Sequence, residues 1–237
     1  MMRAGVLGAA LAGAALALAP LAAGASFRPD TVGVEIARLV VASPVRTHPT
    51  SQSSLLGSIA AVRPLTGQQT ALPVLRRGND GHGAGWLLVR LPGRPAGRVG
   101  WIPVGNVRVA RSPWRVVINR RARQASVYRS GRLQSRFAVV VGTPSTPTPA
   151  GHFFVVEHVQ QVAGSVLGPW ALATSAFSPV LQDFDGGPGQ IALHGRAGVL
   201  ARDPLGTAHS HGCVRFENNV VRRLAGLLPN GTPIDII

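Results

Sequence analysis

The chain has 237 residues and 46% hydrophobic content, enough for one or two buried cores, which excludes an intrinsically disordered protein. Its formal charge of +15 favours an anionic partner, but every basic residue is an arginine and the arginines are scattered without interleaved aromatic residues, so we expect no nucleic-acid binding. The 29 glycines and 19 prolines favour short strands and turns over long helices, and we predict a mostly β protein.

The first 25 residues have the pattern of a secretory signal peptide. Arg3 precedes the apolar run Ala4–Ala23, and a small-x-small site follows at Ala23 to Ala25. We expect cleavage after Ala25 and export to the periplasm or cell wall. An uncleaved membrane anchor is the alternative, because the run is close to the roughly 20 residues that span a bilayer.

Residues 34–110 alternate strand-like runs with turn residues, as in a small β-barrel. The runs expected as strands are Ile36–Val41, Val45–Arg46, Leu55–Val62, Trp86–Leu91, Gly100–Pro103 and Val107–Val109. The domain is either a spacer, with Trp86 and Trp101 as ordinary core residues, or a binding module.

A Ser-Pro pair at 112–113 ends this pattern, and Trp114 opens a second β-rich domain, residues 114–237, with one or two short helices. The expected strands are Arg115–Asn119, Ser126–Tyr128, Phe137–Val141, His152–Glu157, Gln190–Leu193 and Pro233–Ile237. Apolar residues at helical spacing predict a helix from Val220 to Leu228. The segment Ala163–Gly189 is rich in glycine, proline and serine, and we expect a long loop that covers a site.

The segment richest in residues capable of catalysis is Ser-His-Gly-Cys-Val-Arg at 210–215, which contains the chain's single cysteine, Cys213. An exported chain with one cysteine forms no internal disulfide, so this thiol is either buried and inert or free and reactive. A reactive thiol needs a group that takes its proton, and histidine suits this at neutral pH. Gly212 permits a tight turn that aims backbone amides at a developing oxyanion.

His194 is the best-placed candidate base. It ends an apolar run, so a rigid strand would present it, and the following loop returns the chain to Cys213. Two other interpretations stay open: a core histidine, and a zinc site. The ligands of such a zinc site would be His194, His209, His211 and Cys213. Only Asp203 and Glu217 could supply the positioned carboxylate that catalytic zinc requires, so we expect no metal.

The second domain resembles the YkuD-type L,D-transpeptidases. Ile191–Gly195, then Gly206, then Ser210–Arg215 with Asn218 after it resemble the signature of the family, in which an HG pair precedes S/T-H-G-C-I/V-R. Pro147–Phe153 resembles its TPxG segment. Leu228–Ile234 resembles its closing strand, so that the resemblance covers about Trp114 to Ile237.

The first domain resembles bacterial SH3-like domains, which accompany catalytic domains in many exported enzymes. The resemblance is carried by the order of four features: Val45 with Pro49, the Gly57-Ser58-Ile59 step, Gly85-Trp86 with Val89, and Gly100-Trp101-Ile102. It implies association with cell-wall components.

The family resemblance implies a two-step acyl transfer on peptidoglycan stem peptides, without a cofactor. Cys213 would attack the L,D bond of a tetrapeptide stem, and His194 would act as base, its ring oriented by the Gly195 carbonyl. His211 would line and polarise the site, and amides near Gly212 and Cys213 would form the oxyanion hole. Ser210 and Arg215 would hold substrate or the active loop. Arg196 departs from the small polar residue that is frequent in the family.

Three functions compete at this stage. An L,D-transpeptidase passes the acyl group to an amine, and an L,D-carboxypeptidase passes it to water. A non-catalytic wall-binding protein would use residues 34–110 alone. The oligomeric state is unknown.

Overall fold

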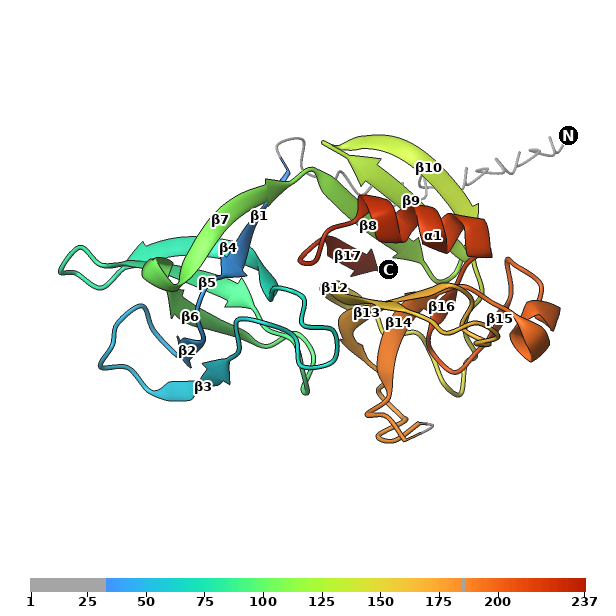
Figure 1. Ribbon diagram of the computed structural model, residues 1–237, viewed down its shortest axis with the longest axis horizontal. Helices are drawn as coiled ribbons and strands as arrows, with labels where there is room; N and C mark the ends of the chain where they lie inside the picture. The colour runs from blue at the N-terminus through green and yellow to red at the C-terminus, as the bar shows by residue number, and fades with distance from the viewer. Residues whose placement is uncertain (1–32, 185) are drawn as a thin grey trace, which may run out of the picture.

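The computed structural model describes residues 33–184 and 186–237, which form two β domains (Figure 1). The first ends with β7 at Ser112 and the second begins with β8 at Trp114. The expected signal peptide, residues 1–25, lies outside the described residues. Within these residues, no helix is long and apolar enough to cross a membrane.

The N-terminal domain is an antiparallel sheet of seven strands in the order β3-β2-β6-β5-β4-β1-β7. Its elements are β1 Val34–Leu39, β2 Ser43–Arg46, β3 Leu55–Ile59, β4 Ala71–Asn79, β5 Gly85–Arg90, β6 Val99–Pro103, the 3₁₀ turn η1 Val104–Asn106 and β7 Val107–Ser112. The sequence did not predict β4, although this strand lies between β5 and β1. The likeness to SH3-like domains stays a prediction.

The C-terminal domain is a curled mixed sheet of eight strands in the order β10-β9-β8-β17-β12-β13-β14-β16. Its strands are β8 Trp114–Asn119, β9 Gln124–Arg129, β10 Arg132–Ala138, β12 Gly151–Gln160, β13 Trp170–Phe177, β14 Gln190–His194, β16 Val214–Arg215 and β17 Pro233–Ile236. A parallel pair, β11 Val141–Gly142 and β15 Ala208–Ser210, lies apart from it. The prediction of a mostly β protein is confirmed.

The one α-helix among residues 33–184 and 186–237, α1 Asn218–Leu227, packs against β13 and β14. Val221 and Leu224 form its buried face, as the helical spacing predicted. A second 3₁₀ element, η2 Gly198–Arg202, lies in the loop between β14 and β15.

The expectation of one long loop over Ala163–Gly189 is wrong, because β13 occupies its middle. This strand consists largely of small residues, whose hydrophobic pattern is weak. It lies between β12 and β14, pairing with both. Neighbouring strands on two sides supply the hydrogen bonds that local sequence preference does not reveal. The loops that remain are 161–169 and 178–189.

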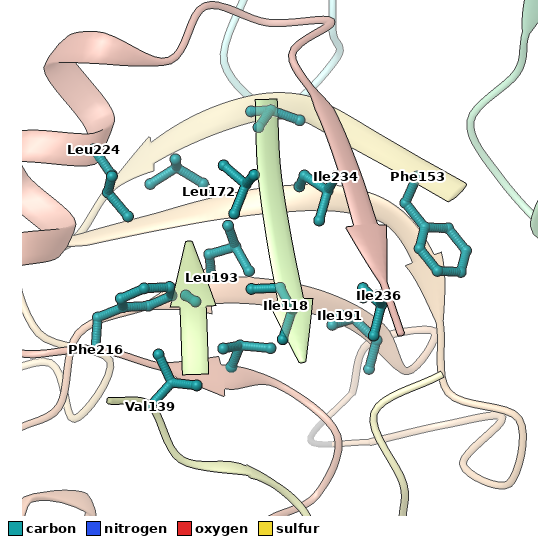
Figure 2. Close-up of a cluster of buried hydrophobic side chains, with 14 of the residues drawn as sticks. Ile118, Val139, Phe153, Leu172, Ile191, Leu193, Phe216, Leu224, Ile234 and Ile236 are labelled. Atoms are coloured by element: carbon teal, nitrogen blue, oxygen red, sulfur yellow. The ribbon is translucent and has the colours of Figure 1, made fainter. Parts of the chain in front are cut away.

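Strand β12 is shared between two hydrophobic cores. Phe153 and Val155 belong to the core of the C-terminal domain, shown in Figure 2, whereas Phe154 and Val156 belong to the core of the N-terminal domain. Alternate residues of a strand point to opposite faces, so an uninterrupted apolar run is expected where both faces are buried. The run at 153–156 therefore joins the two domains.

Polar contacts complete this interface. The Gln68 side chain donates to the His158 carbonyl at 2.7 Å and accepts from the His158 amide at 3.0 Å. The Asn230 side chain donates to the same Gln68 oxygen at 3.0 Å. Thr66 of the N-terminal domain donates to the Glu157 carboxylate at 2.8 Å. The two domains are thus docked by apolar packing and by specific hydrogen bonds.

Candidate active site

The parallel pair β14–β16 places the cysteine and the candidate base on one face of the sheet. Its register aligns Leu193 with Val214, and both of these side chains are fully buried in the core. Side chains alternate along a strand, so Cys213 and His194 both project to the opposite face. The lone thiol and the strand-borne imidazole are therefore neighbours across the sheet, two positions apart along it.

The Cys213 thiol rests against the backbone of β14. The Ala192 amide donates a hydrogen bond to Sγ at 3.4 Å, and Sγ lies 4.0 Å from the Gln190 carbonyl oxygen. Burial raises the pKa of Cys213, while the Ala192 hydrogen bond and the nearby Arg215 charge act in the opposite direction. At neutral pH the resting side chain is therefore a thiol that needs a base.

His194 is held as a neutral imidazole. Burial lowers its pKa to about 4; hydrogen bonding to the Gly195 carbonyl opposes this shift, and the Arg215 charge adds to it. Nδ1 lies 2.6 Å from the Gly195 carbonyl oxygen, and since a carbonyl only accepts, Nδ1 carries the proton. In a neutral ring the other nitrogen, Nε2, is then the basic one.

Across the described residues, no hydrogen bond joins Sγ to the imidazole. The Gly195 carbonyl fixes the orientation of the His194 ring through its contact with Nδ1. Catalytic hydrogen bonds are often long in enzymes without substrate and shorten when it binds, so a thiol–imidazole pair is compatible with the shared sheet face of Cys213 and His194.

The turn that carries the cysteine is held in place by hydrogen bonds from two buried hydroxyl groups. Ser210, fully buried, donates to the Cys213 carbonyl at 2.6 Å and accepts from the Gly212 amide at 3.1 Å. Thr148 donates to the Gly212 carbonyl at 2.8 Å and accepts from the Gly142 amide at 2.8 Å. Ser210 therefore holds the loop, and the Gly212 amide is already bonded within the protein.

Gly212 is required by its backbone and by its surroundings. Its φ is +121°, a region that side chains other than glycine rarely adopt, and an added Cβ would lie 2.8 Å from Ile191 Cδ1. The turn can bring Cys213 against β14 only without a side chain at this position.

Arg215 is buried and forms an ion pair with Asp203. The other Asp203 oxygen lies 3.5 Å from His209 Nδ1. Arg196, the departure from the family pattern, donates to the Asp203 carbonyl at 2.6 Å and pairs with Glu217. The structure thus places both arginines in the framework around η2, and Arg215 in a position to influence the thiol by its charge.

Asn218 and Thr148 shape the site, although sequence reasoning did not select them as site residues. The Asn218 side-chain oxygen accepts from the Arg196 amide at 2.8 Å, and a Cβ on Gly195 would lie 2.2 Å from the same oxygen. Both residues fall inside the motifs that carried the family resemblance, which was the available signal.

In the described part of the chain, no hydrogen bond joins the His211 side chain to Cys213 or His194. The His211 side chain is exposed, and its ring lies 5.0 Å from that of Phe184, centroid to centroid, at an interplanar angle of 34°. Among the residues that the structure describes, no three His, Cys, Asp or Glu side chains are grouped as ligands for a metal ion.

The YkuD L,D-transpeptidase catalytic domain matches residues 113–236. Over 124 residues the chain is 29% identical to the YkuD protein of Bacillus licheniformis and 26% identical to that of Bacillus subtilis. Each match covers 52% of this chain and 66% of the relative, slightly less than two thirds of its length.

Two solved structures are also similar to this chain. An L,D-transpeptidase from Mycobacterium tuberculosis aligns over 71% of this chain and 90% of its own, with 13% identity and a TM-score of 0.47. A structure from Bdellovibrio bacteriovorus aligns over 53% and 48%, with 29% identity and a TM-score of 0.41. Both TM-scores are below 0.5, so the assignment depends on the sequence match. Through residues 113–236, the chain belongs to the YkuD family of L,D-transpeptidase catalytic domains.

Proposed function

We propose that the protein is a peptidoglycan L,D-transpeptidase that transfers an acyl group from a tetrapeptide stem to an amine through Cys213. One observation carries the proposal: a buried, neutral imidazole shares a sheet face with the chain's only thiol. Family membership supports the peptidoglycan substrate.

In the first step, His194 Nε2 takes the thiol proton and Sγ attacks the carbonyl carbon of the L-centre of the diamino acid. The bond from this carbon to the nitrogen of the terminal D-alanine breaks, and the imidazolium returns its proton to that nitrogen. The products are free D-alanine and a thioester on Cys213. The Gly195 carbonyl stabilises the imidazolium that exists between the two proton transfers.

In the second step, an acceptor amine attacks the thioester. His194 removes a proton from the amine, the new amide bond forms, the C–S bond breaks, and the thiolate regains a proton from the imidazolium. Water in place of the amine would make the enzyme a carboxypeptidase.

The Cys213 amide is the proposed oxyanion donor. The Gly212 amide is bonded to Ser210, whereas no acceptor pairs with the Cys213 amide in the part of the chain that the structure describes. Removal of one oxyanion donor typically lowers the rate by about 100-fold or more, so one free amide at this position is a substantial contribution.

The proposal includes export and a peripheral role at the cell wall. The apolar N-terminal run supports export, and the formal charge of +15 suits the anionic wall and the carboxylates of stem peptides. The N-terminal β domain would contribute wall contacts if its likeness to SH3-like domains holds.

The decisive experiment is product analysis with a tetrapeptide donor, with and without an amine acceptor, for the native protein and for Cys213→Ala. We expect released D-alanine and a cross-linked product from the native protein only. Intact-protein mass spectrometry after carbapenem exposure should show an adduct on Cys213. A native, folded protein that forms neither product nor adduct contradicts the proposal, and hydrolysis despite available acceptor assigns a carboxypeptidase instead.

A further inference from the structure

The loop between β13 and β14 runs from residue 178 to 189, is described except at residue 185, and is closed at its base by hydrogen bonds. The Ser178 amide donates to the Gly189 carbonyl at 2.8 Å, and Ser178 Oγ accepts from the Leu181 amide at 3.0 Å. Phe184 and Gly187 exchange two backbone hydrogen bonds of 2.8 and 3.0 Å. In Figure 1 this loop projects beyond β14.

A single arginine of the other domain fastens this base. Arg94 lies between β5 and β6, and its guanidinium donates four hydrogen bonds to three backbone carbonyls of the loop, at distances of 2.8 to 3.2 Å. The acceptors are Ser178, Leu181 and Pro188. The guanidinium also lies over the Phe177 ring, 5.0 Å from its centroid. A planar fork of donors suits several carbonyls at once, which a lysine cannot reproduce.

The loop is built to admit this guanidinium. A Cβ at Gly189, whose φ is +64°, would lie 3.1 Å from Arg94 Nη2 and 2.2 Å from the Leu181 carbonyl oxygen. Any side chain at position 189 would therefore push the loop off the arginine. The need for glycine at position 189 thus supports the same contact between Arg94 and the loop, independently of the hydrogen bonds.

The loop reaches the active site through Phe184. This side chain, 45% exposed, lies against the His211 ring, and His211 is two residues before Cys213. The Phe184 ring therefore presents an apolar surface beside His211, on the segment that leads into Cys213. Phe184 is the element of the loop that meets the cysteine segment, while Arg94 acts at its base.

We propose that Arg94 is a positioning residue of the transpeptidase site, which acts from the N-terminal domain by holding the 178–189 loop so that Phe184 covers the His211 side of Cys213. The proposal deepens the function assigned above and rests on it where substrate is concerned. Phe184 contacts the bound donor, and Arg94 fixes the place of Phe184.

The first test measures access to the thiol and needs no substrate. Cys213 is the chain's only cysteine, so the rate of its alkylation by iodoacetamide can be followed by intact mass. We expect Phe184→Ala and Arg94→Ala each to raise this rate about fivefold, which corresponds to about 1 kcal/mol in the free energy that keeps the thiol covered. Arg94→Lys should resemble Arg94→Ala. Arg76→Ala, which removes an arginine from the Trp101 ring in the same domain, should leave the rate unchanged.

The double variant Arg94→Ala/Phe184→Ala tests whether the two residues act as a unit. Although they are not in contact, their effects should not multiply, and the double variant should alkylate no faster than the faster single variant. Multiplied effects, or a native alkylation rate in Arg94→Ala, would overturn the proposal. Phe184→Ala lies on an exposed loop and keeps the test interpretable if Arg94→Ala folds poorly.

The second test separates this proposal from the proposed function. With a tetrapeptide donor, Arg94→Ala should raise KM about fivefold and leave kcat within about twofold, because the loop contacts substrate and not the reacting atoms. A lowered kcat at unchanged KM would overturn the positioning role. If no variant turns over the donor while the alkylation rates follow the expected order, only the transpeptidase assignment fails.

Discussion

Between about pH 4 and pH 6.5, His194 is protonated in the unfolded chain but neutral in the folded protein. Its folded-state pKa is about 4, against an ordinary value of 6.5. Between these values the unfolded chain binds more protons, so stability that is fully present above pH 6.5 is lost as the pH falls toward 4. The loss amounts to about 3 kcal/mol, since each pKa unit is worth about 1.4 kcal/mol. Urea unfolding from pH 4 to 7 measures it.

His194→Gln should flatten this part of the profile, and the difference between the two proteins isolates the contribution of one residue. His48→Gln, at an exposed position, is the matched control and should leave a profile parallel to that of the native protein. If His194→Gln and the native protein show parallel profiles, the imidazole is not buried in the neutral form.

The same titration is expected to set the acid limit of the proposed acylation of Cys213. A general base must be unprotonated, so carbapenem acylation of Cys213 should fall as the pH drops through about 4, the pKa of His194. If the acylation rate instead falls near pH 6.5, the ordinary pKa of histidine, then His194 in its buried, neutral form is not the base. The measurement is the acylation rate by intact mass across the pH range.

At the scale of single residues, sequence predicted chemical types better than contacts. Cys213 and His194 could be identified from the sequence because a single cysteine close to several histidines is an uncommon combination. The role of Thr148 was not, because its two partners, Gly142 and Gly212, are brought to it by the fold. Arg94 was hidden for the same reason, since its acceptors lie more than 80 residues away.

At the scale of elements, the loop before β12 and the turn before β16 are joined through one hydroxyl. Thr148→Val keeps the shape of the side chain but leaves the Gly142 amide and the Gly212 carbonyl without a partner. We expect a loss of about 2 kcal/mol in the free energy of unfolding, measured with urea. Thr47→Val, at an exposed position, is the control and should change stability little. Equal effects would show that the Thr148 hydroxyl contributes no more than a surface one.

Two of the longer strands, β4 and β13, escaped prediction for reasons of composition; the short strands β15 and β16 were also not predicted, and the expected strand Phe137–Val141 overlaps only the end of β10 and the start of β11. β4 contains Pro73 and the charged pair Arg76 and Arg77, which interrupt its apolar pattern, yet it is paired on both sides. β13 is built mainly from small residues. In both cases neighbouring strands, not local propensity, determine the structure. The predicted helix and the strand β14 succeeded because their apolar periodicity was strong.

At the scale of the whole molecule, β12 contributes to both hydrophobic cores, and we therefore expect the two domains to unfold as one cooperative unit. Phe154→Ala should remove about 3 to 5 kcal/mol, the usual cost of deleting a buried phenylalanine, and much of it from the interdomain contact. We expect calorimetry to show one transition for the native protein and two for Phe154→Ala. Phe153→Ala, on the other face of the same strand, should lower the melting temperature and retain one transition. Two transitions in the native protein would contradict this expectation.

The boundary between the domains along the chain is therefore not the boundary between them in space. Cleavage of the backbone at Pro113 would break the covalent link between the domains. It would leave the packing of Phe154 and Val156 against the first domain intact. The two fragments should co-elute after such a nick and, if produced as separate polypeptides, should reassemble into an active split enzyme. Residues 114–237 alone would expose an apolar patch and tend to aggregate.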